Sequence, residues 1–406
     1  MSNTTPKGNR AHLAVFGRRN AGKSSFVNAF IDQDLCIVSE TPGTTTDPVE
    51  KAYELQPFGP ILMIDTAGLD DTGELGEKRI KKTREVLNRT DFAFILAERG
   101  KFGIFEETII KLFKENNIPW AIVINKADLD DEAEQISYTA YLEKHFGVRA
   151  YSCSSVTGTG IETIRTAVAA TLDQNTPPPP LLSDLVKPPE LVVLVVPIDK
   201  EAPKGRLILP QVQAIRELLD ADIPAIVVKD RELHYTLNYH LKTKPKLVVT
   251  DSQAFLKVNA DVPNDILMTS FSILYARQKG DLSAYVKGVK AIDGLKSGDK
   301  VLVAELCSHR PITEDIGRVK IPRWLKQFKG INVDFDYAVG KDFPEDLSPY
   351  NMVIQCGGCM VNRQLIVNRI RQSEAQQIPI SNYGVVIAYL MGILDRALKP
   401  FPNYQL

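Results

Sequence analysis

The first 175 residues alternate short apolar runs with segments in which apolar residues recur at helical spacing. Apolar runs of strand length occupy residues 12–17, 60–65, 91–97 and 120–125, and helical patterns lie between them. Continuous apolar strands that alternate with amphipathic helices are typical of a doubly wound parallel sheet covered on both faces. We therefore predict a doubly wound α/β domain over residues 1–175.

A proline-rich segment follows this domain. Residues 176–190 read TPPPPLLSDLVKPPE. Because proline removes a backbone donor and stops helices and inner strands, residues 176–189 are predicted to form a stiff, extended linker.

Two further α/β patterns follow the linker. Residues 190–264 combine strands and helices but carry no glycine-rich loop and no ionisable cluster at motif spacing, so this domain is a candidate for assembly rather than catalysis. Residues 265–406 contain two apolar strands that end at Cys307 and Cys356. Sites in open α/β sheets gather outside the carboxyl ends of strands, which draws attention to these two cysteines. The predicted fold class is α/β with three domains.

Composition excludes several classes of protein. A hydrophobic content of 44%, a charged content of 24% and a net charge of −1 are ordinary for a globular protein and indicate no nucleic-acid partner. No apolar run approaches the ~20 residues of a membrane span, and the first 20 residues lack the apolar core of a signal peptide. Five cysteines in 406 residues do not form a disulfide framework. We expect a cytoplasmic protein that binds neither membrane nor nucleic acid.

The segment GRRNAGKS at Gly17–Ser24 matches G-x-x-x-x-G-K-[ST] and lies between a predicted strand and a predicted helix. This is the context that a phosphate-binding P-loop requires. Backbone N–H groups and the helix N-terminus would bind phosphates, Lys23 would reach the β- and γ-phosphates, and Ser24 would ligate Mg²⁺. The phosphate-binding residues predicted from this motif are Gly17, Asn20, Ala21, Gly22, Lys23, Ser24 and Ser25.

Three more motifs follow predicted strands, in the order and spacing of a G domain. Asp65 and Gly68 belong to DTAG, where the carboxylate would hold Mg²⁺ through water and the glycine would sense the γ-phosphate. In NKAD, Asp128 can accept hydrogen bonds from the two N–H groups that guanine has and adenine lacks. The predicted base-binding residues are Asn125, Lys126, Asp128, Ser154 and Ser155. The predicted nucleotide is GTP.

With these motifs, residues 10–174 resemble the TrmE–Era–EngA–YihA–septin-like class of GTPases. The resemblance implies that Thr45, in PGTTTD, is the threonine that senses Mg²⁺ and the γ-phosphate, although Thr44 and Thr46 leave the register open. It also implies that Asn20 binds a K⁺ ion that stimulates hydrolysis; the alternative is a loop residue that tolerates left-handed backbone. Leu69 stands where many G domains carry a water-orienting glutamine. We therefore expect slow intrinsic hydrolysis, with Lys23, Ser24, Thr45, Asp65 and Gly68 as the catalytic set.

Three of the five cysteines form a second pattern. Cys307 and His309 belong to CSHRP, and Cys356 and Cys359 belong to CGGC. A dithiol redox pair, a structural zinc site with His309 as the fourth ligand, a plain turn and a [4Fe–4S] cluster with one open iron site all remain possible from these residues. Cys36 and Cys153 have no partner at motif spacing and are interpreted as small buried hydrophobic residues.

A G domain, a proline-rich linker, a mid-sized α/β unit and this cysteine pattern together resemble the HydF family of [FeFe]-hydrogenase maturation GTPases. The resemblance spans the chain and implies a GTPase, a dimerisation domain and a cluster-binding domain whose [4Fe–4S] ligands are Cys307, Cys356 and Cys359. The family pattern places a histidine directly before C-x-x-C, where this sequence has Gln355. The fourth ligand is then His309, Glu305, Glu314, water or a visiting ligand.

The resemblance implies a homodimeric scaffold that hydrolyses GTP, binds the cluster and delivers a diiron precursor to apo-[FeFe]-hydrogenase. Two radical-SAM maturases would be its upstream partners, and GTP would gate the association of partners. The alternative function is a ribosome- or tRNA-associated GTPase with a C-terminal structural zinc site. The balanced charge and the lack of a basic, aromatic-rich segment weigh against that alternative.

Overall fold

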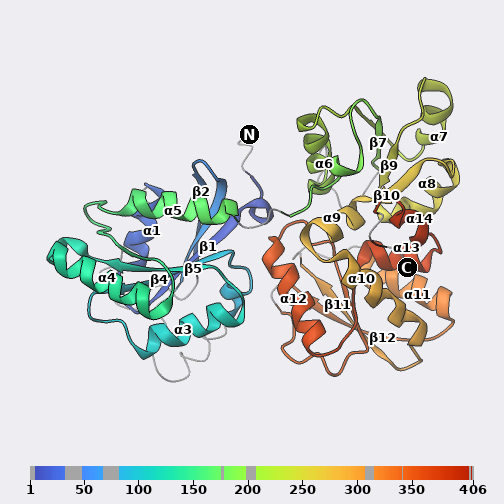
Figure 1. The fold of residues 1–406 in the computed structure, drawn as a ribbon. Helices are drawn as coiled ribbons and strands as arrows, with labels where there is room; N and C mark the ends of the chain where they lie inside the picture. Colours follow the sequence, from blue (N-terminus) through green and yellow to red (C-terminus); the bar gives the residue numbers. More distant parts are fainter. Residues whose placement is uncertain are drawn as a thin grey trace. The chain divides into compact units, whose positions relative to one another are not determined.

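The chain folds into two compact units, Met1–Pro177 and Pro178–Leu406, each built from parallel β-sheet and α-helices (Figure 1). The structure is a computed structural model that describes residues 5–32, 48–66, 82–174, 178–197, 207–306, 315–340, 342–401 and 404. None of the helices within these ranges combines the length and the apolar character that a membrane span requires. The α/β class predicted from the sequence is confirmed.

The first unit contains a six-stranded sheet in the order β2-β3-β1-β4-β5-β6, in which only β2 runs antiparallel to its neighbour. Its strands are β1 (Ala11–Gly17), β2 (Val49–Leu55), β3 (Gly59–Asp65), β4 (Phe92–Glu98), β5 (Trp120–Asn125) and β6 (Ala150–Ser152). The apolar runs predicted the four central strands. Strand β2 was missed because, as an edge strand, it leaves most of its side chains only partly buried and interleaves charged with apolar residues.

Helices cover both faces of this sheet (Figure 1). They are α1 (Lys23–Ile31), α3 (Ile104–Glu115), α4 (Glu132–Phe146) and α5 (Ile161–Gln174), with short 3₁₀ turns at Lys7–Asn9 and Ala127–Leu129. Because successive strand residues point to opposite faces, Val15 and Phe94 pack with α1 and α5, whereas Phe16 and Ile95 pack with α3 and α4. This is the doubly wound arrangement that the sequence predicted.

The second unit contains two four-stranded parallel sheets. The first has the order β10-β9-β7-β8. It comprises β7 (Val192–Val195), α6 (Leu209–Asp220), β8 (Ala225–Val228), α7 (Leu233–Tyr235), β9 (Leu247–Thr250), α8 (Phe255–Asp261) and β10 (Leu267–Ser270), with short helical turns at Ser183–Leu185, Thr236–His240 and Ser252–Ala254. The boundary predicted at residue 264 is wrong, because β10 lies beyond it and completes this sheet by pairing with β9.

The other sheet has the order β12-β11-β13-β14. Helices α9 (Phe271–Lys279) and α10 (Leu282–Val289) lead into β11 (Lys300–Glu305), and α11 (Ile321–Lys329) leads into β12 (Asp334–Val339). The remaining elements are β13 (Met352–Gln355), α12 (Arg363–Ala375), β14 (Ile380–Asn382), α13 (Tyr383–Leu390) and α14 (Leu394–Leu398), with short turns at Lys290–Gly294 and Ile316–Lys320. Strand β11 lies between β12 and β13, so the ends of β11 and β13 are neighbours.

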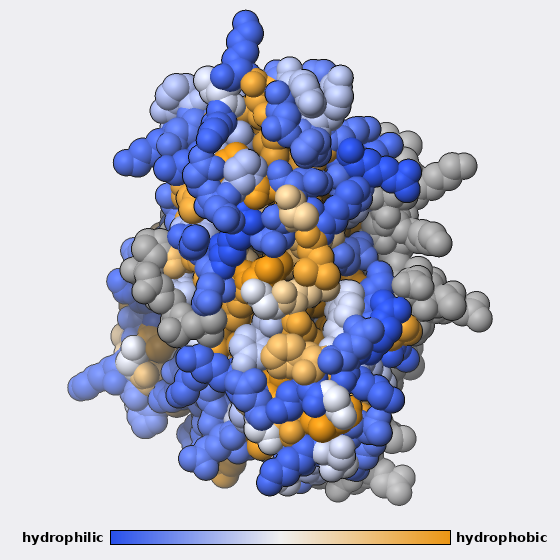
Figure 2. Space-filling view, turned by 90° about the vertical axis from the view of Figure 1, so that its right-hand side faces the viewer, coloured by the Kyte–Doolittle hydropathy of each residue, from blue (hydrophilic) through white to orange (hydrophobic). Residues whose placement is uncertain are grey.

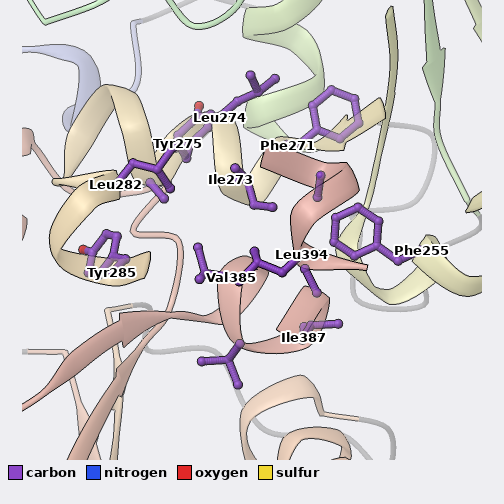
Figure 3. Close-up of a cluster of buried hydrophobic side chains, with 14 of the residues drawn as sticks. Phe255, Phe271, Ile273, Leu274, Tyr275, Leu282, Tyr285, Val385, Ile387 and Leu394 are labelled. Atoms are coloured by element: carbon purple, nitrogen blue, oxygen red, sulfur yellow. The ribbon is translucent and has the colours of Figure 1, made fainter. Parts of the chain in front are cut away.

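One hydrophobic core joins these two sheets. Helix α9 contacts both β10 and β14, and α14 packs on β10. Figure 3 shows the side chains at this junction, where Phe271 and Ile273 of α9 lie close to residues of α13 and α14. The dimerisation and C-terminal domains predicted as separate domains therefore form one compact unit, because the same buried side chains serve both sheets.

The described part of the proline-rich segment, predicted to be a stiff, extended linker, packs within the second unit. Leu181 and Leu182 are fully buried. The backbone N–H groups of Leu181, Leu182 and Ser183 each donate to the carboxylate of Glu217 at 2.8 Å. The prediction considered only the prolines and not the apolar residues between them, Leu181 and Leu182, which are buried in the core.

Candidate functional site

The loop between β1 and α1 has the backbone that a phosphate-binding turn needs. Gly22 has φ +90°, and a Cβ there would lie 2.3 Å from Nδ2 of Asn125, so glycine is required both by conformation and by space. Lys23 is buried, and its Nζ donates to the carbonyls of Gly17 at 3.0 Å and Arg18 at 2.7 Å. The ammonium group is thus held at the loop that precedes the N-terminus of α1.

Ser24 and Asp65 meet at this loop. The Ser24 hydroxyl donates to Oδ2 of Asp65 at 2.5 Å, joining the first turn of α1 to the end of β3. Burial raises the pKa of Asp65, and the hydrogen bond from Ser24 and the charge of Lys23 offset part of that effect. A hydroxyl and a carboxylate side by side are oxygen ligands of the kind that Mg²⁺ prefers.

Asn125 connects three of the predicted motifs. Its Nδ2 donates to the Ala21 carbonyl in the P-loop at 3.0 Å. Its Oδ1 accepts hydrogen bonds from the backbone N–H and the hydroxyl of Ser155, at 3.1 and 2.8 Å. Segments more than 100 residues apart in the sequence are therefore joined through one amide side chain.

Asp128 and Ser154 form the remaining part of the base-binding side. The Ser154 hydroxyl donates to Oδ1 of Asp128 at 2.5 Å. Lys126 has φ +66° and its Nζ donates to Glu98 at 2.7 Å. The carboxylate of Asp128 is thereby oriented beside the loop that carries Ser154 and Ser155, as a guanine-reading acceptor would need.

The sequence did not single out an ion pair that supports the P-loop. Arg18 donates from Nε and Nη2 to the two oxygens of Glu106, at 2.8 and 3.0 Å, and Glu106 is fully buried. Glu106 also accepts the backbone N–H of Gly103 at the start of α3. A glutamate three residues after a helix start is a capping signal and could have been found, but its pairing with Arg18 depends on tertiary structure.

Asn20 has φ +63° and an exposed side chain, so the left-handed backbone considered for it is present. Cys153 is fully buried, and burial raises the pKa of its thiol to about 12, which confirms its interpretation as a small hydrophobic residue. Predictions on four residues of the first unit lie outside the described residues: Cys36, Thr45, Gly68 and Leu69.

Cys356 lies at the carboxyl end of β13, directly beside the end of β11. Its backbone N–H donates to the Ala304 carbonyl at 3.0 Å, and its Sγ accepts the backbone N–H of Leu306 at 3.1 Å. Burial raises the pKa of the Cys356 thiol, while the backbone N–H groups of Leu306 and Gly358 lower it. The residue after Leu306 is Cys307, which lies outside the described residues.

The turn between Cys356 and Cys359 is tight. Both cysteines are half-buried and reduced. Gly358 has φ +64°, and a Cβ there would lie 2.5 Å from Cδ1 of Ile366. This close packing of the backbone on α12 explains why glycine occupies that position.

Glu305, one candidate fourth ligand, and Gln355, which stands where the family has a histidine, both bind other side chains. Both oxygens of Glu305 are bound by Arg318, at 3.1 and 2.9 Å. Gln355 is fully buried, and its Nε2 donates to the hydroxyl of Tyr285 at 2.9 Å. His309 and Glu314 lie outside the described residues.

Across the described ranges, no group of three or more His, Cys, Asp or Glu side chains is arranged to hold a metal ion. Since Cys307 falls in the gap at 307–314, the described part of the chain supplies only two of the three predicted thiolates.

Family profiles match three segments of the chain. Residues 12–126 match the 50S ribosome-binding GTPase family, residues 181–280 the hydrogen maturase F dimerization domain, and residues 283–400 the hydrogen maturase F tetramerization domain. The two hydrogen maturase F matches together cover more than half of the chain. The chain belongs to the hydrogen maturase F family. The family model over residues 283–400 describes tetramerization, where the sequence predicted cluster binding. The two hydrogen maturase F matches do not favour the ribosome- or tRNA-associated alternative.

Several named GTPases are similar to part of this hydrogen maturase F chain. The tRNA modification GTPase MnmE of Heliobacterium modesticaldum is 36% identical over 116 residues, which is 28% of this chain and 24% of the relative. GTPase Era of Alkaliphilus metalliredigens is 27% identical over 236 residues, 55% of this chain and 79% of the relative. The chain thus spans about a quarter of the MnmE relative. A solved structure of Aquifex aeolicus Era bound to GDP and AlF4⁻ has a TM-score of 0.37 and 19% identity, and the match covers 54% of this chain and 91% of that one.

Proposed function

We propose that this chain is a maturation factor of [FeFe]-hydrogenase that hydrolyses GTP and carries an iron–sulfur cluster. In this function the first unit hydrolyses GTP, and the second unit binds a [4Fe–4S] cluster and a diiron precursor. The precursor passes to apo-[FeFe]-hydrogenase after two radical-SAM maturases have acted upstream. The family membership and the geometry at Cys356 support this proposal.

In the GTPase reaction, the P-loop amides and Lys23 bind the phosphates of GTP, and Asp128 accepts the two N–H groups of guanine. Ser24 and Thr45 would hold Mg²⁺, Asp65 would act on it through water, and Gly68 would sense the γ-phosphate. The short Ser24–Asp65 contact supports this assignment, because both oxygens already lie at one place. Asn20 would hold K⁺, whose positive charge would stabilise the phosphates. Hydrolysis gates the association of partners.

The single observation that carries the cluster proposal is the hydrogen bond from Leu306 N–H to Sγ of Cys356, at 3.1 Å. This bond holds Leu306, the residue that follows β11 and precedes Cys307 in sequence, against the C-x-x-C turn. The donor chemistry fits the group, because backbone N–H groups that donate to cysteine sulfur are a feature of iron–sulfur sites. Cys307, Cys356 and Cys359 would hold three irons, and the cluster supplies a fourth iron that is open to His309, Glu314, water or the precursor. Glu305 is already paired with Arg318.

We also propose that the chain forms a homo-oligomer through its second unit. The matched families are named for dimerization and tetramerization. Among the described strands β8 lies at the edge of its sheet, and Val227 on it is 45% exposed, so β8 offers an apolar side chain at a sheet edge. Figure 2 shows that apolar side chains gather at the surface on one face of the molecule. Exposed apolar surface of this kind is typical of an oligomer interface.

The test is anaerobic reconstitution of the full chain with iron and sulfide. The expected result is about four irons per chain and broad absorption near ~400 nm. Colourless protein that binds zinc in place of iron would instead indicate a structural zinc site and contradict the proposal.

A further inference from the structure

Lys279 is a buried cation fastened to the C-x-x-C turn. It stands at the end of α9 and is only 5% exposed. Its Nζ donates to the carbonyl oxygens of Cys359 at 3.1 Å and Val361 at 2.9 Å, and it lies 5.1 Å from the ring centroid of Tyr275. Figure 3 shows Tyr275 on α9 beside Leu282 of α10, in the core that joins the two sheets. The ammonium charge is therefore held next to the second cysteine by a rigid part of the fold.

Arg369 is a second buried cation on the side of Cys356. It projects from α12, is 3% exposed, and donates from Nη2 to the carbonyl of Gly340 at 2.6 Å. Its guanidinium lies 4.6 Å from the ring centroid of Phe343. Nε and Nη1 are buried, and neither has a hydrogen-bond partner among the described residues. Buried donors without acceptors are costly, so these two N–H groups indicate that an acceptor belongs nearby.

Arg369 is electrostatically coupled to the first cysteine. Burial lowers the pKa of Arg369 to about 10, and negative charge on Cys356 or Tyr285 would act in the opposite direction. Gly340, which accepts from Arg369, donates its own backbone N–H to the carbonyl of Glu305 at 2.7 Å, and the next residue, Leu306, donates to Sγ of Cys356. The guanidinium therefore lies at the same edge of the sheet as the first cysteine. Glu305, the acidic residue at the end of β11, forms an ion pair with Arg318.

We propose that Lys279 and Arg369 are positioning residues that make the C-x-x-C turn a site for an anionic iron–sulfur cluster. This inference rests on the proposed function. Thiolates and sulfides together give such a cluster negative charge, and two buried cations balance it where water cannot. Arg369 also has N–H groups available for cluster sulfides, whereas Lys279 holds the turn in the conformation that presents Cys359.

This arrangement has a consequence for the reduction potential. One-electron reduction adds a negative charge to the cluster, and nearby buried cations favour the more negative state. Removing either cation should therefore make the midpoint potential more negative. It should also speed the loss of iron to a chelator, because the thiolates repel one another more strongly.

The experiment compares Lys279→Met and Arg369→Met with the wild-type full chain after anaerobic reconstitution with iron and sulfide. Matched controls are Lys287→Met and Arg371→Met, which remove exposed cations from α10 and α12. The readouts are the midpoint potential, from dithionite titration followed by EPR, and the rate of iron release to a chelator. We expect a more negative potential and at least about threefold faster release in both buried variants, and wild-type values in both controls.

Wild-type potential and release rate in Lys279→Met and Arg369→Met would overturn this inference and leave the proposed function standing. Failure of the wild type itself to bind a cluster would overturn the proposed function. If a methionine variant does not fold, Lys279→Gln and Arg369→Gln replace it, because they keep a donor and lose the charge. Wild-type potential in these glutamine variants would equally overturn the inference.

Discussion

Arg277 of α9 binds Asp184 through both terminal nitrogens: Nη1 lies 3.0 Å from Oδ2, and Nη2 lies 2.6 Å from Oδ1. Nη2 also donates to the carbonyl of Pro180. Arg277 is 7% exposed whereas the Asp184 side chain is 41% exposed, so this contact lies at the edge of the core of the second unit. The segment that directly follows the boundary between the two units is therefore fastened to α9.

Replacing Arg277 with methionine should destabilise the second unit by about 2 kcal/mol, because backbone carbonyls of the proline-rich segment lose a buried donor. Calorimetry of the full chain checks this, since GTP shifts the transition of the first unit and identifies the other transition. The control is Arg216→Met, which breaks an exposed pair with Asp220 and should change stability by less than about 0.5 kcal/mol. Equal effects of the two variants would contradict the role of Arg277.

Asp128→Asn should weaken GTP binding by about 100-fold. The carboxylate is expected to accept two N–H groups of guanine, and hydrogen bonds to a charged acceptor contribute about 1.5–3 kcal/mol each. Titration with a fluorescent GTP analogue measures the change. Asp173→Asn, at an exposed position on α5, should bind GTP like the wild type. Unaltered affinity in Asp128→Asn would remove this residue from the base-binding site.

The first unit should lose stability as the pH falls from about 4.5 to about 2. Burial by itself raises the pKa of Glu50, but its interactions with Lys7 and Arg89 outweigh burial and lower the pKa to about 2. Above pH 4.5 Glu50 is ionised in both states and stabilises the fold. Below pH 4.5 the unfolded chain binds a proton at Glu50, whereas the folded chain does so only near pH 2. The free energy of unfolding therefore falls by up to about 3 kcal/mol.

Glu50→Gln should flatten this acid dependence of the GTP-shifted melting transition. Glu54→Gln on the same strand is the control, since the Glu54 side chain is 56% exposed and pairs with Arg10 only at 3.4 Å. The same acid slope in wild type and Glu50→Gln would show that Glu50 is not the responsible group.

Gln355→Ala should leave the iron content of the reconstituted protein unchanged. The side chain of Gln355 donates to Tyr285 and is not expected to ligate iron. Stability should nevertheless fall by about 1–3 kcal/mol, because the variant leaves a buried hydroxyl unpaired and opens a cavity. Tyr285→Phe removes the other partner of the same bond and should likewise keep the iron content. Iron loss in Gln355→Ala alone would make Gln355 a ligand.

Cys359→Ser should abolish cluster binding and leave GTP hydrolysis at the wild-type rate. Thiolate ligation is lost, whereas the P-loop lies in the other compact unit. Iron analysis and a phosphate-release assay measure the two effects on one preparation. Loss of nucleotide binding in this variant would show that the two activities are not modular.

Much of the first unit followed from local patterns. Continuous apolar runs predicted β1, β3, β4 and β5, and the glycine and lysine spacing predicted the P-loop, because strand burial and phosphate binding depend on neighbours in sequence. The contacts of Asn125 with Ala21 and Ser155 were not predictable in detail. They depend on three loops meeting at one edge of the sheet.

The sequence by itself determined the α/β class and the nucleotide motifs, and it predicts that C-x-H joins C-x-x-C in one site. Only the tertiary structure decided that β10 belongs to the middle sheet, that the proline-rich segment packs on Glu217, that Glu305 binds Arg318 and that Gln355 donates to Tyr285. It also decided where Lys279 and Arg369 lie. Motif residues are close in sequence and can be recognised from their spacing. A buried ion pair or a shared core depends instead on side chains that long-range packing brings together.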